Sequence, residues 1–302
     1  MVILTHRDTV AAYLESGFSN LTVVPSDGLY NEWNLMNAQP LTARSRLRIG
    51  GHQRPDSLNP LASTSAWGWR WMRLYYDYLV RLAPSAEPRL WAAESIEIIG
   101  EAALEVRLRP GMTFHDGVPV TADDVAFSFA FLRESDFGYF DAYLEPLDSV
   151  EVIDPLTLRF NLSHPSASFV TTALSQISIL PRNLWEGIED PTALDAASVP
   201  MVGSGPFRFS GHAPDHQMTL ERFDEHFAVP AIGITGIEFL FYPDSTAVLS
   251  ALGEAEIDMT AGTLDPWLIP LAEKAEDVGI IAAHDIGFNH VSFNLRRHVF
   301  AD

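Results

Sequence analysis

The sequence predicts an α/β fold built on a mixed β-sheet. Segments with the apolar spacing of helices alternate irregularly with segments of strand character, and no strict strand–helix–strand repeat is visible. The 20 Pro and 19 Gly are spread along the chain, which favours many short elements joined by turns. With 302 residues, the chain is long enough for two compact domains of roughly 150 residues and for a large buried core.

The N-terminal part of the chain predicts short elements separated by turns. Residues 9–15 favour a short helix, and residues 21–24 favour a strand that ends at the turn signal of residues 25–28. A second strand is expected at residues 47–50, before a loop that is rich in Pro, Asn and Ser. This part of the chain therefore has a mixed α/β character.

The clearest elements come next. Apolar residues recur at spacings of three and four over residues 66–80, which predicts an amphipathic helix. Residues 96–108 alternate between apolar and polar with a break at Gly100, as is typical of a β-hairpin. A second helix is expected to begin at Thr121, because a capping hydroxyl followed by two carboxylates suits the positive end of a helix dipole.

The rest of the chain continues with short strands and helices. Alternating or wholly apolar runs predict strands, and helical spacing predicts two more helices. The expected strands lie at residues 157–162, 207–209, 218–222, 237–242 and 257–259, and the expected helices at residues 167–174 and 245–252.

Composition excludes several classes of function. The absence of Cys excludes disulfide scaffolds, thiolate zinc sites and thiol nucleophiles. The 19 Lys and Arg residues oppose 40 Asp and Glu residues, so neither nucleic acid nor an anionic membrane surface is an expected partner. Lys274 is the only lysine, and Arg with surplus carboxylate is typical either of a halophile or of a genome biased toward Arg codons. The halophile hypothesis predicts that molar salt stabilises the fold.

No targeting segment or membrane span is expected in the sequence. Residues 1–7 turn polar before an apolar run forms, so no signal peptide is visible. No stretch approaches 18 uncharged apolar residues. We expect a soluble chain whose export signal or lipid anchor, where it has one, lies outside these residues.

One segment carries a highly specific motif. Residues 114–129 read Phe-His-Asp-Gly-Val-Pro-Val-Thr-Ala-Asp-Asp-Val-Ala-Phe-Ser-Phe, and shorter motifs accompany this segment. The shorter motifs lie at residues 55–60, 76–82, 203–207, 255–258 and 293–297. In sequence and order they resemble the peptide and nickel class of solute-binding proteins that serve ABC importers. The resemblance covers about residues 46–302 and implies a lobe of the type II periplasmic-binding-protein-like fold with a small appended α+β subdomain.

The resemblance also implies a domain organisation. Residues 47–302 correspond to the first lobe of the family, with the small subdomain inserted at about residues 75–200. Residues 1–38 look like the family's C-terminal return to this lobe, and residues 39–46 form a linker; an unrelated N-terminal extension is the alternative. In the family, a far lobe follows a segment like residues 293–297 and provides much of the ligand enclosure, whereas this sequence contains no such lobe.

Catalytic and metal-binding motifs are weak in this sequence. His115 with Asp116 or Asp123 is a possible acid/base group, but turn and cap roles account for this segment better. Ser204 lies between two glycines without the residue order of a nucleophile elbow, so a close backbone approach to a ligand or a neighbouring strand is the better interpretation. His212 and His216 have the four-residue spacing of a helical metal pair, but Pro214 between them disfavours a shared helix face, so loop histidines are the better interpretation. We expect neither a metal nor a cofactor.

The candidate ligand-binding residues follow from strand ends, loops and the resemblance. Trp69 cannot share a helix face with its neighbouring tryptophans, so it is expected to line a cleft or a contact between lobes. Trp267 lies in a loop from which an indole can stack on a ligand or cover the core. The full set is Ser63, Thr64, Ser65, Trp69, Ser204, Gly205, Thr260, Ala261, Gly262, Trp267, Asn289 and His290, and its first-ranked segments are residues 63–65 and 260–262.

The resemblance predicts a receptor that performs no chemistry. Two lobes would close over a peptide or similar small solute by hinge motion, and the permease subunits of an ABC importer would recognise the closed state. The expected location is extracytoplasmic, at the cell surface or in the periplasm. An isolated lobe that acts as an interaction module is the alternative, and a hydrolase that uses carboxylates or histidines is a further one.

Overall fold

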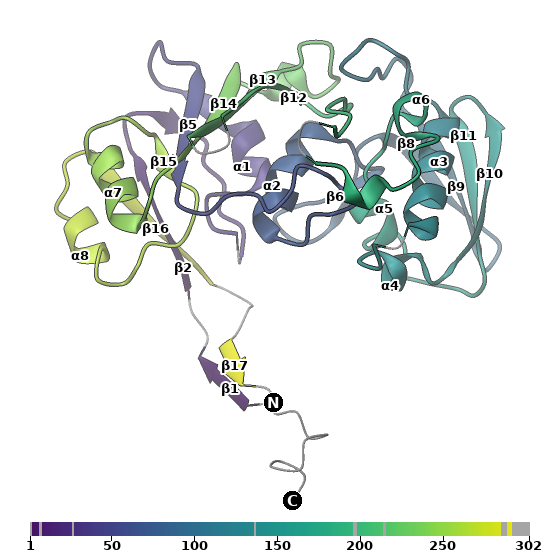
Figure 1. The fold of residues 1–302 in the computed structure, drawn as a ribbon, viewed down its shortest axis with the longest axis horizontal. Coiled ribbons are helices and arrows are strands. Elements are labelled where there is room, and N and C mark those ends of the chain that lie inside the picture. Colours follow the sequence, from purple (N-terminus) through teal and green to yellow (C-terminus); the bar gives the residue numbers. More distant parts are fainter. Residues whose placement is uncertain are drawn as a thin grey trace, which may run out of the picture.

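A computed structural model gives the fold of most of the chain. Two bodies lie side by side, a larger one around a seven-stranded sheet and a smaller one around a four-stranded sheet, with helix α2 (Ala66–Tyr75) between them (Figure 1). None of the helices in the part that the structure describes is long and apolar enough to cross a bilayer. The structure describes residues 2–5, 8–25, 27–135, 137–195, 198–213, 216–284 and 289–291.

The large sheet is mixed, as the sequence predicts. Its strand order is β12-β13-β14-β5-β15-β2-β16, in which β14, β5 and β15 run parallel and the other pairs are antiparallel. The strands are β12 (Phe207–Ala213), β13 (Gln217–Arg222), β14 (Gly236–Phe241), β5 (Arg46–Gly51), β15 (Met259–Thr260), β2 (Asp8–Leu14) and β16 (Val278–His284).

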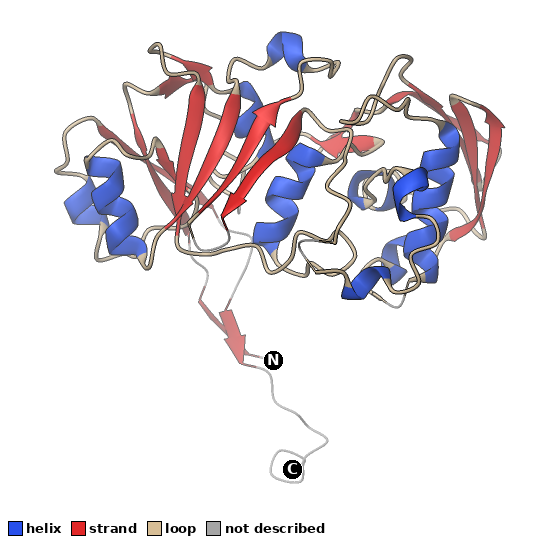
Figure 2. Cartoon of the chain, turned by 45° about the horizontal axis from the view of Figure 1, so that its top comes forward, coloured by secondary structure: helices blue, strands red, loops and turns tan. Residues whose placement is uncertain are grey.

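Helices cover both faces of this sheet (Figure 2). Helices α7 (Ser245–Gly253) and α8 (Ile269–Ala272) pack on one face over a small apolar core that includes Ala12. Ala11, the preceding residue of β2, belongs instead to the main core, together with α2 and α1 (Glu32–Asn37). The two-residue period of a strand thus gives β2 one apolar side chain for each core.

The small body is an antiparallel sheet with helices on one face. Its strand order is β10-β11-β9-β8, and its longest helix, α3, packs against β10 and β11. The elements are β8 (Ala93–Ile99), β9 (Ala103–Leu108), β10 (Leu147–Asp154), β11 (Thr157–Leu162), α3 (Ala122–Glu134), α4 (Asp141–Leu144), α5 (Ala173–Gln176) and α6 (Arg182–Trp185).

Short pairs of strands complete the described fold. The ribbon formed by β1 and β17 continues from β2 and β16 and lies below the large sheet in Figure 1. The remaining elements are β1 (Val2–Thr5), β17 (Asn289–Val291), β3 (Phe18–Ser19), β4 (Gln39–Pro40), β6 (Val80–Leu82), β7 (Pro88–Leu90) and the 3-10 turns Pro191–Ala193 and Val229–Ala231.

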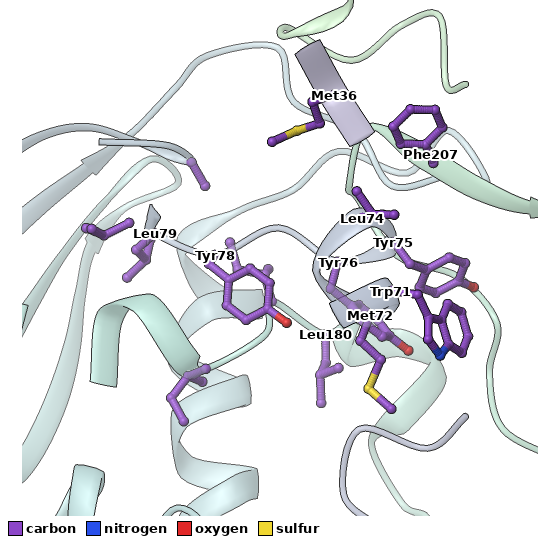
Figure 3. Packing of buried hydrophobic residues seen from close by; sticks show 14 of the residues in the cluster. Met36, Trp71, Met72, Leu74, Tyr75, Tyr76, Tyr78, Leu79, Leu180 and Phe207 are labelled. Carbon is purple, nitrogen blue, oxygen red and sulfur yellow. The ribbon is translucent and has the colours of Figure 1, made fainter. Parts of the chain in front are cut away.

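One continuous apolar core joins the two bodies. Figure 3 shows Trp71 and Tyr75 of α2 near Phe207 of the large sheet, and Tyr78 with Leu180 on the side of the small body. All five side chains are at most 1% exposed. Burial of this kind contributes about 25 cal/mol per Å² of apolar surface, so the two bodies stabilise each other.

Helix α3 begins where the sequence predicts. The carboxylate of Asp124 accepts hydrogen bonds from the backbone N–H of Thr121 at 2.9 Å and from its hydroxyl at 2.8 Å. The other oxygen of this carboxylate accepts from the backbone N–H of Arg182 at 3.1 Å. The cap therefore also fixes the start of α6 against α3.

Several local predictions were wrong. The helix expected over residues 66–80 ends at Tyr75, and the strand expected at residues 257–259 begins only at Met259. Residues 9–15 were expected to form a helix, but they belong to strand β2, because pairing with both β15 and β16 outweighs the weak propensity of so short a helix. Residues 21–24 form no strand; only Val24 makes an isolated bridge, to Gly28. The helix expected at residues 167–174 is confined to α5, after a run of turns.

Candidate functional site

A large open cavity lies beside α2, between α1, the loop that follows β6 and the loop that precedes α4. Its volume is about 670 Å³, within the usual range for small-molecule sites. Thr64 and Trp69, two of the residues predicted from the sequence, are among the residues that line it. Both bodies of the fold contribute to its wall.

The first turn of α2 is held by an exposed carboxylate. One oxygen of Asp56 accepts from the hydroxyls of Ser63 at 2.6 Å and Ser65 at 2.7 Å, and the other accepts from the backbone N–H groups of Thr64 at 2.7 Å and Ser65 at 3.1 Å. The hydroxyl of Ser65 in turn caps the helix by accepting from the N–H of Gly68 at 3.1 Å. Partial burial raises the pKa of Asp56, but these hydrogen bonds outweigh it and hold the pKa well below its usual range.

Stacked aromatic rings join α2 to the small body at the cavity wall. Trp69 stacks on Tyr139 with ring centres 5.4 Å apart, and Tyr139 stacks on Phe137 at 5.6 Å. Phe140 meets Trp69 edge-on at 5.4 Å. Such pairs stabilise by about 0.5–1.5 kcal/mol beyond their buried area, so this column fixes the position of the Trp69 indole.

Two acidic and two basic side chains line the same cavity. Arg70 pairs with Asp27 at 2.6 Å, while Arg73 donates to the side-chain oxygen of Gln176 at 2.6 Å. Glu32 lies 3.8 Å from Arg73, and its charge, after the opposing effect of burial, keeps the pKa of Arg73 raised. The charged wall of the cavity is therefore internally paired.

A buried ionic network extends from Glu32 into the core. Arg81 is fully buried, contacts Glu32, and lies 3.8 Å from Asp77 and 4.5 Å from the ring centre of Trp91. The Asp77 carboxylate accepts from the indole N–H of Trp91 at 2.7 Å and lies 3.2 Å from Nε2 of His226. Buried charges persist only with such partners, so this network couples the cavity wall to the junction of the two bodies.

His226, which is buried, and His115, which is partly buried, have both ring nitrogens engaged. Nδ1 of His226 accepts from the N–H of Ala228 at 3.1 Å, which leaves the proton of the neutral ring on Nε2. Nδ1 of His115 accepts from the N–H of Gly203 at 3.2 Å, and its Nε2 donates to the carbonyl of Gly205 at 3.0 Å. Burial lowers the pKa of His115 to about 4. His115 thus acts as a neutral clamp on the backbone.

Ser204 lies where the backbone passes close to α2. A Cβ at Gly203 would come within 2.1 Å of the Tyr75 carbonyl oxygen, and one at Gly205 within 2.6 Å of the Leu74 carbonyl oxygen. The hydroxyl of Ser204 is buried and has no partner among the described residues. The close approach expected from the two glycines is therefore made to the end of α2.

The other predicted site residues lie in separate places. Ala261 lines a small pocket with Trp67 and Tyr30, whose rings stack at 5.3 Å. Arg70, which lines the large cavity, lies over both rings. Thr260 lines a third pocket with Gly262, and its hydroxyl accepts from the N–H of Ala12 at 3.1 Å.

The remaining candidates are not gathered at the cavity. Ser204 lines a pocket with His226 at the junction of the two bodies, and Trp267 is 65% exposed beside α8. Asn289 and His290 belong to β17, but their side chains lie outside the described residues. A ligand role for any residue of the predicted set stays a prediction.

Several cavity residues escaped the sequence analysis. Arg70 and Arg73 lie three residues apart on α2, a helical spacing that places them on one face and was available as a signal. Tyr139 lies in an aromatic-rich stretch, which was a weaker signal. No signal in the sequence marked Asp27 and Glu32, because their position depends on where the N-terminal segment joins the fold. No described group of three or more His, Asp or Glu residues has a geometry that would hold a metal ion.

The fold and the cavity define a class of protein, a type II periplasmic-binding-protein-like lobe with a ligand-sized open cavity. The family model of bacterial extracellular solute-binding proteins, family 5 Middle, matches residues 87–302. The chain therefore belongs to the family 5 solute-binding proteins, as its motifs indicate. Its family members are extracellular proteins by description.

Two relatives illustrate the match in sequence. The chain is 26% identical over 265 residues to the oligopeptide-binding protein AppA of Bacillus subtilis, covering 85% of this chain and 47% of that protein. It is 29% identical over 262 residues to a putative ABC transporter peptide-binding protein of Brucella ovis, covering 81% of this chain and 46% of the relative. The chain thus spans about half the length of the curated relatives it matches.

Solved structures share the fold. AppA of Bacillus subtilis in complex with a nonapeptide superposes with a TM-score of 0.68 at 25% identity, covering 78% of this chain and 47% of that one. NikZ of Campylobacter jejuni in complex with Ni(L-His) gives a TM-score of 0.67 at 21% identity, covering 78% and 46%, and shares the fold.

Proposed function

We propose that the protein is the substrate-binding component of an ABC-type importer and captures a peptide or a similar small solute outside the cytoplasm. Family membership and the names of the relatives, which include peptide-binding proteins of ABC transporters, support this function. The observation that carries it is the open cavity of about 670 Å³ at the junction of the two bodies. Its permease partner would recognise the solute-loaded state.

The chain supplies one wall of the binding site in this proposal. The cavity is open, and the match covers about half of each relative, so a far lobe would close over the solute from the opposite side. Binding to this chain alone is then weaker than binding to a two-lobed protein, because part of the solute stays in water.

The direct test is calorimetric titration of the chain with pools of short peptides and, separately, with Ni²⁺. A heat of peptide binding that is measured with the unaltered chain and is absent from the Trp69→Ala variant supports the proposal, because this variant removes the indole from the cavity wall. Ile98→Ala is the matched control, because Ile98 is 76% exposed on the small sheet and does not line the cavity. Absence of binding by any peptide pool, even with a far lobe supplied, would contradict the proposal.

A further inference from the structure

All four charged side chains that line the large cavity already have partners from the protein. Arg70 pairs with Asp27 at 2.6 Å, and Arg73 is bound by Gln176 at 2.6 Å. Glu32 is bound to the fully buried Arg81. The two acids and two arginines of the lining have formal charges that cancel. The cavity therefore presents no unpaired charge to a solute.

Contact of a charged group with this wall would carry a cost. Such a group would lose the part of its hydration that faces the wall, and it would have to break one of these pairs to gain a partner. Breaking the Arg70–Asp27 pair would also disturb the guanidinium that lies over Tyr30 and Trp67 at about 5.5 Å. The existing network thus discriminates against ions of either sign.

The rest of the wall is largely apolar and aromatic. Trp33 and Trp69 contribute indole rings, Tyr139, which is 41% exposed, contributes a phenol ring, and Leu82 and Pro84 contribute aliphatic surface. Apolar burial of a solute group against this wall contributes about 25 cal/mol per Å². The chemistry of the wall favours a ring or an aliphatic chain.

The two indole N–H groups of the wall differ. The N–H of Trp33 donates to the Leu82 carbonyl at 2.6 Å. The N–H of Trp69 is buried and has no acceptor among the described residues. A buried donor without a partner costs about 1–3 kcal/mol, so an acceptor supplied from outside the chain would recover that energy. Trp69 therefore favours an oxygen or nitrogen acceptor on the bound group.

We propose that the cavity binds an uncharged apolar or aromatic group of the solute, with a hydrogen-bond acceptor placed against the indole N–H of Trp69. This inference rests on the proposed function and assigns a chemical class to the part of the solute that this chain binds. It follows from the paired charges, the aromatic wall and the free indole donor together.

The test uses three small probes that differ in charge: N-acetyl-phenylalanine amide, N-acetyl-lysine amide and N-acetyl-glutamate amide. Binding to the whole chain is followed by NMR through the indole N–H signals, and Trp69→Phe identifies the signal of Trp69. We expect the neutral probe to shift that signal and to bind at least about tenfold more tightly than either charged probe. Trp69→Phe keeps a stacking ring but removes the donor, so it is expected to weaken the binding of the neutral probe by about tenfold.

A second variant tests the charge balance. Asp27→Asn is nearly isosteric and leaves Arg70 without its carboxylate, so the cavity gains one positive charge. The acidic probe should then bind at least about tenfold more tightly than to the unaltered chain, while the lysine probe gains nothing. Thermal unfolding of both variants shows that they remain folded.

The outcomes separate this inference from the proposed function. Equal binding of charged and neutral probes, failure of every probe to bind, or no effect of Trp69→Phe would overturn the inference. Peptides that bind the chain while the probes show no preference would leave the proposed function standing. A shift of the Trp69 signal by the neutral probe, without any peptide binding, would support the cavity chemistry and contradict the proposed function.

Discussion

Two carboxylates flank helix α2 and are stabilised in opposite ways. Asp56, before the helix, is exposed and accepts from hydroxyls and backbone N–H groups of residues 63–65. Asp77, after the helix, is fully buried and depends on Arg81, Trp91 and the distant His226. An exposed carboxylate can be satisfied by its own loop, whereas a buried one needs charged and polar partners from across the fold.

Replacement of Asp77, the buried carboxylate, is expected to lower the free energy of unfolding most. Asp77→Ala leaves Arg81 with only Glu32 as a carboxylate partner and removes the acceptor of the Trp91 indole. We expect a loss of about 3–5 kcal/mol in the free energy of unfolding, measured by urea denaturation. A loss below that of Asp56→Ala would contradict the contrast between the two carboxylates.

His115, whose ring binds the backbone of Gly203 and Gly205, gives the next largest effect, a dependence of the free energy of unfolding on pH. Its pKa falls from 6.5 to about 4 on folding because the ring is buried, so the unfolded chain takes up the proton first. The folded state therefore gains stability from the neutral His115 ring that is complete above pH 6.5. This gain is lost as the pH falls toward 4, by about 3 kcal/mol at most.

His115→Gln removes the titrating group and serves as the comparison for this pH effect. The free energy of unfolding of both chains is measured from pH 7.5 to 4.5. The difference between them should change within that window. A parallel pH dependence of the two chains would contradict the assignment to His115.

Replacement of Asp56, the exposed carboxylate, is expected to lower the free energy of unfolding least. Asp56→Ala removes the acceptor that orders the loop before α2, including the N-cap hydroxyl of Ser65. We expect a loss of about 1–2 kcal/mol, with increased hydrogen exchange confined to the first turn of α2. Asp56→Asn is the matched variant and should recover part of the loss, because its amide oxygen still accepts one of the hydrogen bonds.

The same contrast explains how much the sequence predicts. The start of α3, the mixed character of the sheet and the start of α2 follow from sequence patterns, and the structure confirms them, although α2 ends at Tyr75 and not at residue 80. The strand at residues 8–14 was taken for a helix because its character comes from β15 and β16, far along the chain. In the same way, Trp69 was predicted from the spacing along α2 and Thr64 from its loop and the resemblance, whereas Glu32 joins the cavity only through tertiary packing.

The most direct test of the cavity as the solute site is hydrogen exchange of the chain, with and without a saturating amount of the best-binding short peptide. The structure predicts protection of the backbone at residues 64–73 and 82–86 and at Tyr139, which line the cavity. Protection restricted to residues 260–262, beside the separate small pockets, would contradict it.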